Sequence, residues 1–311
     1  MSVIHLAYPR GFCAGVDRAI SIVEKALETF PAPLYVHHEI VHNTHVVESL
    51  KLRGVIFVEE LSHVPHHSTV IFSAHGVSPD VIEVAKSRNL KILDATCPLV
   101  TKVHIEARRY DREGYQIVLI GHRNHVEAIG TQGEAPEKIT IVETEADIDR
   151  LHFSSDEKIA YLTQTTLSVR DTRSLIQKLK LKFPNIEGPA SSDICYATTN
   201  RQLAVEKITR EVDLMLVIGS KNSSNSNRLR ELAKDDGTTA YLIDSATDLQ
   251  DAWFSEKKPR VGLTAGASAP EILVQNVIKR LKDHYGYSEI KEIRVTEEDV
   301  VFKLPKALMK S

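Results

Sequence analysis

The chain has 311 residues, of which 42% are hydrophobic, 26% charged and 6% aromatic. This composition is typical of a globular protein with a large buried core, and it excludes disordered and fibrous architectures. With 39 Lys and Arg against 42 Asp and Glu, the net charge is −3, and neither sign is concentrated in a tail. We therefore expect no nucleic acid and no membrane as a partner, whereas a small-molecule partner stays open.

The sequence carries no targeting signal that we can identify. No apolar run approaches the roughly 20 residues that a membrane helix needs. The first residues, MSVIHLAYPR, lack the basic and apolar regions of a signal peptide. We therefore predict a cytoplasmic protein.

Short apolar β-type runs alternate with amphipathic helical stretches along the chain. Candidate strands include TVIFSA, KILDAT, YQIVLIG, KIAYLT, DLMLVIG and RVGLTAG. Helix-start signals follow polar loops at Asn43, at Ser78, at Ser168 and at Ser268 near Pro270. The pattern predicts an α/β protein with mainly parallel sheets, in which loops at the carboxyl ends of strands bind ligands.

The three cysteines, Cys13, Cys97 and Cys195, each begin a similar succession of features, with a helix-like stretch first. A polar loop follows 28 to 30 residues after the cysteine, at His42, at His125 and at Ser223 to Asn225. An acidic strand end follows after 46 to 49 residues, at Glu59, Glu143 and Asp244. A second polar loop follows after 62 to 73 residues, at His75, Thr165 and Ser268. We infer three similar α/β domains that bring their cysteines and polar loops towards a common centre.

The repeat sets the expected domain boundaries. The three α/β domains are predicted at residues 14–96, 97–194 and 195–285. Residues 1–13 and 286–311 are expected to be terminal segments that pack on the core. The stretch EIRVTEEDVVFKLPKAL in the second of these indicates a terminal strand pair or an extension, and we assign it no chemistry.

The cysteines contain no CxxC pair, which fits neither a secreted disulfide framework nor a zinc ribbon. Each one alone is commonly a small buried hydrophobic residue. At equivalent positions, three thiolates can serve one metal centre, and thiolates suit iron–sulfur clusters and zinc, although structural zinc is usually closed by four ligands. A 4Fe–4S cluster held by three cysteines leaves one iron for a substrate oxygen.

Polar loops suggest what such a centre acts on. His42, His75 and His125 are each commonly capping or core residues when taken singly, but together at strand-to-helix junctions they favour a ligand role. The third domain carries GSKNSSNSNR and TAGASAP, whose hydroxyls, amides and helix N-terminal N–H groups can cradle an anion. A Ser/Asn run by itself is often only a capped loop; with the histidines it indicates a phosphate or diphosphate pocket.

Glu127 lies two residues after His125 on the same loop. It is either a first-turn residue that favours the helix dipole, or a buried acid with a raised pKa that donates a proton. Thr165, in TQTTLS, either caps a helix near Ser168 or contacts the same substrate and relays that proton.

Eight motifs together resemble the family of 4-hydroxy-3-methylbut-2-enyl diphosphate reductases, the last enzymes of the non-mevalonate isoprenoid pathway. They are PRGFCAGVDRAI, FSAHGV, LDATCP, GHRNHVEAIG, TQTTLS, DICYATTNRQ, GSKNSSNSNR and TAGASAP, and the match extends to about residue 285. The resemblance implies three α/β domains in a pseudo-threefold arrangement around a central 4Fe–4S cluster on Cys13, Cys97 and Cys195. Loss of the exposed iron would leave a 3Fe–4S form.

The resemblance also implies the other site residues. The diphosphate substrate would be held by His42, His75, His125, Ser223, Ser224, Asn225 and Ser268. Thr165 would contact its hydroxyl end, and Glu127 would supply the proton. The implied reaction removes the hydroxyl with two external electrons and gives isopentenyl diphosphate or dimethylallyl diphosphate.

Electrons must come from outside, because there is no GxGxxG fingerprint and no second cysteine set. The family implies a flavodoxin or ferredoxin partner.

Two other classes of function stay open. A lyase of the quinolinate-synthase kind would line its loops with arginines, whereas these loops offer His, Ser and Asn; an iron or redox sensor would present a basic face, which the balanced charge does not favour.

Overall fold

A computed structural model describes residues 2–254 and 258–309 of the chain. It divides into two compact units. The first unit holds the described residues of Met1–Val16, His42–Leu50 and Tyr196–Val301. The second unit holds those of Asp17–Val41, Lys51–Cys195 and Phe302–Ser311.

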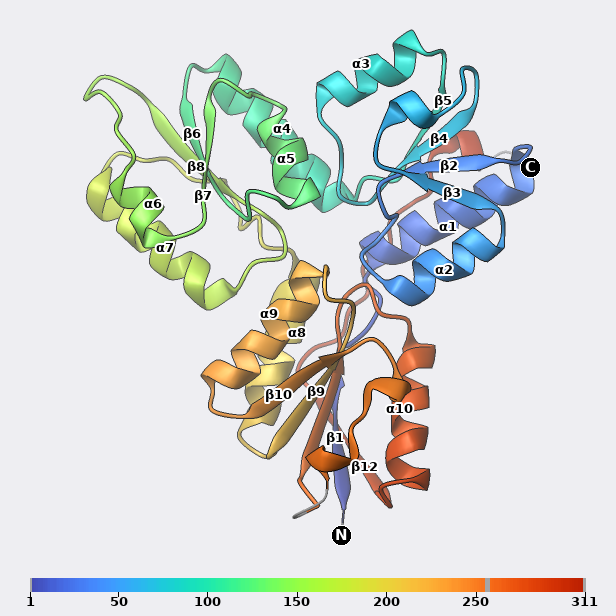
Figure 1. Ribbon diagram of the computed structural model, residues 1–311. Coiled ribbons are helices and arrows are strands. Elements are labelled where there is room, and N and C mark those ends of the chain that lie inside the picture. Colours follow the sequence, from blue (N-terminus) through green and yellow to red (C-terminus); the bar gives the residue numbers. More distant parts are fainter. Residues whose placement is uncertain (1, 255–257, 310–311) are drawn as a thin grey trace. The chain divides into compact units, whose positions relative to one another are not determined.

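The first unit is built on one parallel sheet with the strand order β10-β9-β11-β1-β12 (Figure 1). Its strands are β1 (Val3–Tyr8), β9 (Leu214–Ile218), β10 (Thr239–Ile243), β11 (Val261–Ala265) and β12 (Glu289–Arg294). Its helices are α8 (Tyr196–Thr209), α9 (Ser224–Asp235), α10 (Glu271–Asp283) and the short η2 (Ala246–Asp248) and η3 (Asp251–Trp253).

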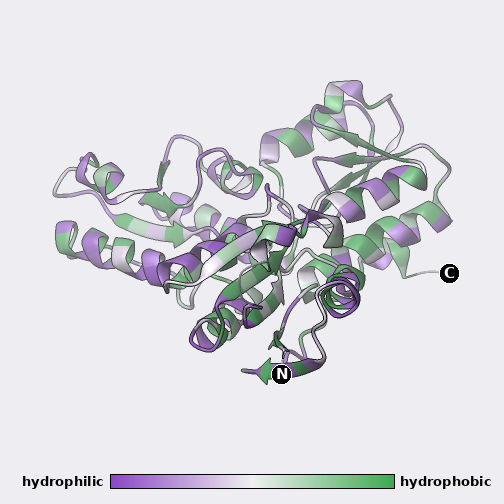
Figure 2. Ribbon diagram, turned by 60° about the horizontal axis from the view of Figure 1, so that its bottom comes forward, coloured by the Kyte–Doolittle hydropathy of each residue, from purple (hydrophilic) through white to green (hydrophobic). Residues whose placement is uncertain are grey.

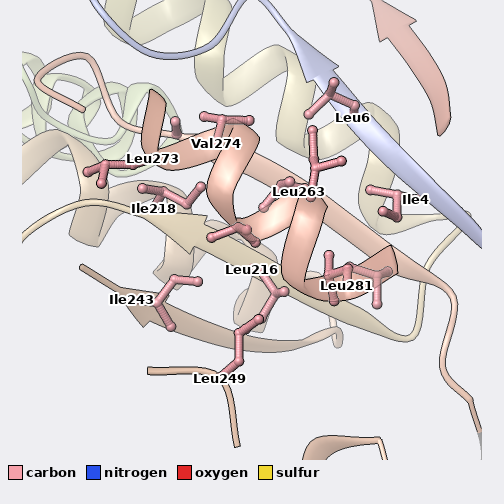
Figure 3. Close-up of a cluster of buried hydrophobic side chains, with 14 of the residues drawn as sticks. Ile4, Leu6, Leu216, Ile218, Ile243, Leu249, Leu263, Leu273, Val274 and Leu281 are labelled. Carbon is pink, nitrogen blue, oxygen red and sulfur yellow. The ribbon is translucent and has the colours of Figure 1, made fainter. Parts of the chain in front are cut away.

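Both faces of this sheet are covered, because the side chains of a strand alternate between its faces. In β9, Leu216 and Ile218 join the cluster that includes Val274 of α10. Figure 3 shows this cluster. Met215 and Val217 belong to a second cluster with residues of α8 and α9. The continuous apolar run of β9 is therefore that of a parallel strand buried on both faces.

The second unit contains two further parallel sheets, with the orders β3-β2-β4-β5 and β7-β6-β8. The elements around the four-stranded sheet are β2 (Leu34–His37), β3 (Val55–Val58), η1 (Leu61–His63), β4 (Thr69–Phe72), α3 (Pro79–Ser87) and β5 (Lys91–Asp94). The elements around the three-stranded sheet are α4 (Pro98–Arg112), β6 (Gln116–Ile120), α5 (Val126–Gln132), β7 (Ile139–Val142), α6 (Glu145–Asp149), β8 (Ile159–Thr163) and α7 (Val169–Lys182). Three elements lie outside these lists: α1 (Ala14–Thr29), α2 (Thr44–Leu52) and η4 (Lys306–Leu308).

The three-stranded sheet is also buried on both faces. Ile117 and Leu119 of β6 pack with residues of α4 and α5, whereas Val118 and Ile120 pack with residues of α6 and α7. The helices that cover the sheets carry both apolar and polar residues, which Figure 2 shows as green and purple on the same helix. No helix of the described residues combines the length and apolarity that crossing a membrane requires.

The prediction of an α/β protein with three parallel-sheet units is confirmed. The six strands named from sequence are β4, β5, β6, β8, β9 and β11. Ser78 and Ser168 cap α3 and α7 as expected, but the helix after Ser268 begins at Glu271 and has Pro270, without a side-chain cap, at its N-cap position.

The terminal segments contribute to the sheet of the first unit. β1 lies between β11 and β12, and all three strands are parallel. The alternative of a strand pair in the C-terminal stretch is wrong, because β12 ends at Arg294 and the described residues from Val295 to Pro305 form no strand. β12 finds its partner in β1 instead, close to 290 residues away in sequence.

Candidate functional site

The predicted polar loops all follow two neighbouring strands of each sheet. In the three repeats these neighbours are β2 and β4, β6 and β8, and β9 and β11. From β2 and β4, and from β9 and β11, the chain continues in opposite directions across the sheet; beyond the edge strand β8 of the three-stranded sheet, the described residues add only the isolated bridge of Glu187 with Ala160. Such a pair is a topological switch point, where open α/β sheets bind ligands. Six predicted site residues belong to the first unit: Cys13, His42, Ser223, Ser224, Asn225 and Ser268. The other six belong to the second unit: His75, Cys97, His125, Glu127, Thr165 and Cys195.

The three cysteines occupy equivalent places in the fold. Each one directly precedes a helix, since α1, α4 and α8 begin at the next residue. Each backbone N–H donates to a carbonyl in a second polar loop. The acceptors are Ala267 for Cys13 at 3.2 Å, Ala74 for Cys97 at 3.0 Å and Thr165 for Cys195 at 3.0 Å. The repeat predicted from spacing is therefore also a repeat of hydrogen bonding.

A thiol at a helix N-terminus is suited to act as a thiolate ligand, because the helix dipole and free N–H groups favour negative charge there. Burial raises the pKa of Cys13, and hydrogen bonds from the backbone N–H groups of Val16 and Gly15 oppose this. Soft sulfur donors that accept N–H bonds are the donor set of iron–sulfur proteins. Among the described residues, no group of three or more His, Cys, Asp and Glu side chains lies close enough to hold a metal ion.

Glu127 is a buried acid in the second unit. Its side chain accepts two hydrogen bonds from Thr165: from the backbone N–H at 2.6 Å and from Oγ1 at 2.9 Å. The residue is only 3% exposed, and this burial raises the pKa of its carboxyl group. The two bonds from Thr165 oppose the rise because they favour the charged form. Glu127 can therefore hold a proton at higher pH than an exposed glutamate can.

Two histidines of the second unit lie together near this acid. The rings of His75 and His125 meet edge to face, with centroids 5.9 Å apart. Nδ1 of His125, which caps α5, accepts from the backbone N–H of Glu127 at 3.1 Å, so the neutral ring carries its proton on Nε2. Nδ1 of His75 lies 3.1 Å from Oγ of Ser73. The structure thus brings His75, His125, Glu127 and Thr165 into one part of the second unit.

The polar loops of the first unit are joined through hydroxyl groups. Ser268 Oγ donates to the backbone carbonyl of His42 at 2.8 Å and lies 3.5 Å from Ser223 Oγ. Ser223 caps α9, and its Oγ accepts from the backbone N–H of Ser226 at 3.3 Å. Nδ1 of His42 lies 3.3 Å from Nδ2 of Asn222. These loops therefore place neutral polar groups at the N-terminus of a helix, an arrangement that suits an anion.

Asn225 ties the two loops of this region together. Its Oδ1 accepts from the backbone N–H of Ala267 at 2.9 Å, and its Nδ2 donates to Oγ1 of Thr198 at 3.3 Å. Ser226 fills the space beside it so closely that a Cβ at either Gly219 or Gly266 would collide with its hydroxyl. The glycines of these two loops are required by this close approach.

Sequence reasoning missed several polar residues around the site. His104 of α4 is 5% exposed, and its Nδ1 lies 2.7 Å from the carboxylate of Glu134, which also binds Arg108 at 2.7 Å. Thr198 was missed as well. Neither His104 nor Thr198 belongs to the repeat of polar loops, and no sequence signal separates them from ordinary helix residues.

Comparison with known proteins defines the class. A solved structure titled the E-1-hydroxy-2-methyl-but-2-enyl-4-diphosphate reductase from Plasmodium falciparum matches with a TM-score of 0.96 and 43% identity, covering 99% of this chain and 97% of the other. Proteins named 4-hydroxy-3-methylbut-2-enyl diphosphate reductase are 54% identical over 306 residues in Neisseria meningitidis serogroup C and 55% identical over 309 residues in Pseudomonas aeruginosa. These two alignments cover 98% of this chain, and 94% and 98% of the relatives. The class is that of the α/β reductases.

The sequence model of the LytB protein family matches residues 4–282. The chain belongs to the LytB protein family. The predicted resemblance is thereby confirmed, and so is the prediction of an oxidoreductase.

Proposed function

We propose that the chain reduces 4-hydroxy-3-methylbut-2-enyl diphosphate. The substrate, two electrons and two protons give water and either isopentenyl diphosphate or dimethylallyl diphosphate. The C–O bond to the hydroxyl breaks, a C–H bond forms at one end of the allyl unit, and the hydroxyl leaves as water. The names of relatives that align over nearly the whole chain support this reaction.

We propose that Cys13, Cys97 and Cys195 hold one 4Fe–4S cluster. Their equivalent positions before α1, α4 and α8, and the sulfur donor set itself, fit that group. When bound, the cluster supplies electrons singly and offers an iron without a protein thiolate as a Lewis acid for the substrate hydroxyl. Because three thiolates hold only three corners, a purified sample can also contain the 3Fe–4S form.

The diphosphate is bound, in this proposal, by His42, Ser223, Ser224, Asn225 and Ser268 of the first unit and by His75 and His125 of the second. Support comes from the α9 N-terminus and the hydroxyl groups around it, since helix N-termini favour anions. Asn225 Nδ2 has a second hydrogen for a ligand while it keeps its bond to Thr198. A protonated histidine adds a charge-assisted donor.

Glu127 acts as the proton source, and Thr165 orients it. The two hydrogen bonds from Thr165 fix the carboxyl group, and burial keeps its proton available. Thr165 also contacts the hydroxyl end of the substrate in this proposal. A flavodoxin or ferredoxin-type protein in the cytoplasm supplies the electrons; the donor and the location rest on the sequence prediction alone.

The observation that carries the proposal is the arrangement of the three cysteines and a buried acid. The cysteines occupy equivalent positions, and the backbone N–H of each donates a hydrogen bond to a carbonyl of a polar loop. The test is anaerobic. Iron and sulfide are quantified in the purified protein, and the spectrum of the reduced cluster is followed while the diphosphate substrate is added. Oxidation of the cluster with release of five-carbon diphosphates is the expected result. If the spectrum of the cluster did not change when the substrate was added, the assigned reaction would be wrong and a lyase or a sensor would be favoured. If the purified protein contained no iron, the assignment of the cofactor would be wrong.

A further inference from the structure

Three basic residues stand at similar positions in the repeat, in the second turn of the helix that follows each cysteine. Arg18, Lys102 and Arg201 lie five, five and six residues after Cys13, Cys97 and Cys195. They belong to α1, α4 and α8. A basic residue in such a position usually reaches solvent or an acidic residue one turn away. All three instead reach backbone carbonyls far away in sequence.

In the second unit, Arg18 binds the segment that leads into Cys97. Its Nη1 donates to the carbonyl of Thr96 at 2.9 Å, across 78 residues of sequence. Its Nη2 donates more weakly to the carbonyl of Asp94 at 3.4 Å. Thr96 is the residue directly before Cys97, so the guanidinium fixes the peptide that carries this thiol.

Lys102 does the same for the segment that leads into Cys195. Its Nζ donates to the carbonyls of Ser191 at 2.9 Å and Ser192 at 3.1 Å, across 89 and 90 residues of sequence. It also pairs with Oδ1 of Asp193 at 3.2 Å, and that side chain is fully buried. Three contacts from one ammonium group therefore hold the segment just before Cys195.

In the first unit, Arg201 binds the segment that leads into Cys13. Its side chain is 0% exposed, which is rare for arginine unless the charge is paired. Nη2 donates to the carbonyls of Gly11 at 2.7 Å and Phe12 at 3.3 Å. Glu298 neutralises the charge, with 3.1 Å between Nη1 and Oε1. The two carbonyls before Cys13 thus share one buried guanidinium.

These contacts form a cycle through the repeat. The basic residue after Cys13 holds the segment before Cys97, the one after Cys97 holds the segment before Cys195, and the one after Cys195 holds the segment before Cys13. Hydrogen bonds from a charged donor are roughly twice as strong as neutral ones. A residue that only anchored its own helix would not bind the segment before a different cysteine in all three repeats.

The C-terminal stretch, to which the sequence assigned no chemistry, supports two of these contacts. Besides Glu298, which binds Arg201, the backbone carbonyl of Lys303 accepts from Nε of Arg18 at 2.9 Å. Asn200 Nδ2 also donates to Oε1 of Glu298 at 2.9 Å. This stretch therefore completes the hydrogen bonding of two of the three basic side chains.

We propose that Arg18, Lys102 and Arg201 are positioning residues that hold the cysteine thiols in place for cluster binding. Arg18 acts on Cys97, Lys102 on Cys195 and Arg201 on Cys13, so each acts on the cysteine of another repeat. The proposal rests on the proposed function, because it presumes that the three cysteines are ligands. Its distinctive feature is the crossing from one repeat to the next.

The first experiment measures alkylation of each cysteine separately, by mass spectrometry, in the protein freed of metal. Arg18→Gln is expected to accelerate the alkylation of Cys97 about tenfold, and Lys102→Gln that of Cys195, because each loses a charge-assisted bond that closes the segment. Lys25→Gln and Arg109→Gln are the controls. They lie on the same two helices. Lys25 loses its contact with Glu28, and Arg109 loses its contacts with Glu106 and with the ring of Tyr110, all within three residues.

Replacement of the fully buried Arg201 endangers folding, so Glu298→Gln tests the third contact. It is expected to accelerate alkylation of Cys13. Its control is Glu297→Gln, an exposed neighbour that binds Tyr8 and Arg294 instead. The proposal would be overturned if Arg18→Gln accelerated alkylation only at Cys13 and Lys102→Gln only at Cys97. It would also be overturned if a variant accelerated alkylation equally at all three cysteines.

A second experiment uses the reconstituted protein and a competing iron chelator. The Arg18, Lys102 and Glu298 variants are expected to hold iron about 10–100-fold less tightly than the controls, as is usual when residues that orient metal ligands are changed. Unchanged iron retention together with unchanged alkylation overturns the positioning role. Absence of iron from the wild-type protein overturns the proposed function instead, while the alkylation pattern still decides the positioning role.

Discussion

The site residues of the two units lie in similar α/β repeats, but their side chains provide different chemistry. In the second unit the first turn of α5, which follows β6, carries a buried carboxyl group, Glu127, and not the loop itself as expected from sequence; the loop after β8 carries a hydroxyl that binds it, Thr165. In the first unit the loops after β9 and β11 carry neutral hydroxyls, those of Ser223 and Ser268. One set can hold and move a proton, whereas the other can bind an anion without adding a charge that titrates.

This difference shows what the repeat does and does not set. The fold supplies strand ends at a switch point in every repeat, and the residue types at those ends decide the electrostatics. A carboxylate in place of Ser223 or Ser268 would repel a diphosphate. A serine in place of Glu127 would not act as an acid at neutral pH. Variants of Glu127 should therefore affect turnover, and variants of the hydroxyls after β9 and β11 should affect diphosphate affinity.

The largest effect is expected from Glu127→Gln. The amide keeps the shape and can accept from Thr165, but it cannot donate a proton as an acid does, so turnover should fall by about 10²–10⁴-fold. Steady-state turnover is compared with diphosphate affinity, which should stay close to normal. Glu145→Gln, which alters an exposed residue on α6, is the control. Near-normal turnover would remove Glu127 from the proton-donor role.

A smaller effect, on affinity, is expected from Ser268→Ala in the first unit. The variant loses the hydroxyl, whose single hydrogen is donated to the carbonyl of His42 and would have to turn to the diphosphate when this ligand binds. Diphosphate binding should weaken about tenfold, the loss of one good hydrogen bond, when measured by calorimetry. Ser245→Ala, which changes the cap of the short η2 helix, is the control. If turnover changed while affinity did not, the division of roles between Glu127 and the hydroxyls after β9 and β11 would be wrong.

Thr165→Val is expected to change the pH dependence of turnover. The Oγ1 hydrogen bond favours the charged form of Glu127, so its loss should raise the pKa of this carboxyl further above its ordinary value of 4.5. Since activity requires the protonated acid, the decline of turnover on the alkaline side should move to higher pH. Thr165→Ser keeps the hydroxyl and should leave the profile in place. Identical profiles for the two variants would contradict the link between Thr165 and Glu127.

The smallest effect concerns stability. Because burial raises the pKa of Glu127, the folded protein binds this proton more tightly than the unfolded chain, and stability is lost as the pH rises through the folded-state pKa. Glu127→Gln has no such proton. Urea unfolding between about pH 5 and about pH 8 should show a shallower decline for the variant. Parallel curves would mean that Glu127 titrates alike in both states.

Much of the architecture could be predicted from sequence because its signals are local. The runs that become β6 and β9 are apolar over consecutive residues, and Ser78 and Ser168 mark the starts of α3 and α7. The spacing of the cysteines and polar loops identified the repeat. The place of β1 could not be predicted, because its partner β12 is close to the other end of the chain and no local pattern pairs them.

The sequence by itself determined the α/β class, the threefold repeat and the residue types available at each strand end. Only the tertiary structure decided that Thr165 binds Glu127, that His104 is buried against Glu134, and that basic residues cross from one repeat to the next. The physical reason is distance along the chain. Strand and helix patterns depend on neighbours a few residues apart, whereas a contact such as that of Arg201 with Gly11 spans 190 residues and exists only after the sheet has formed.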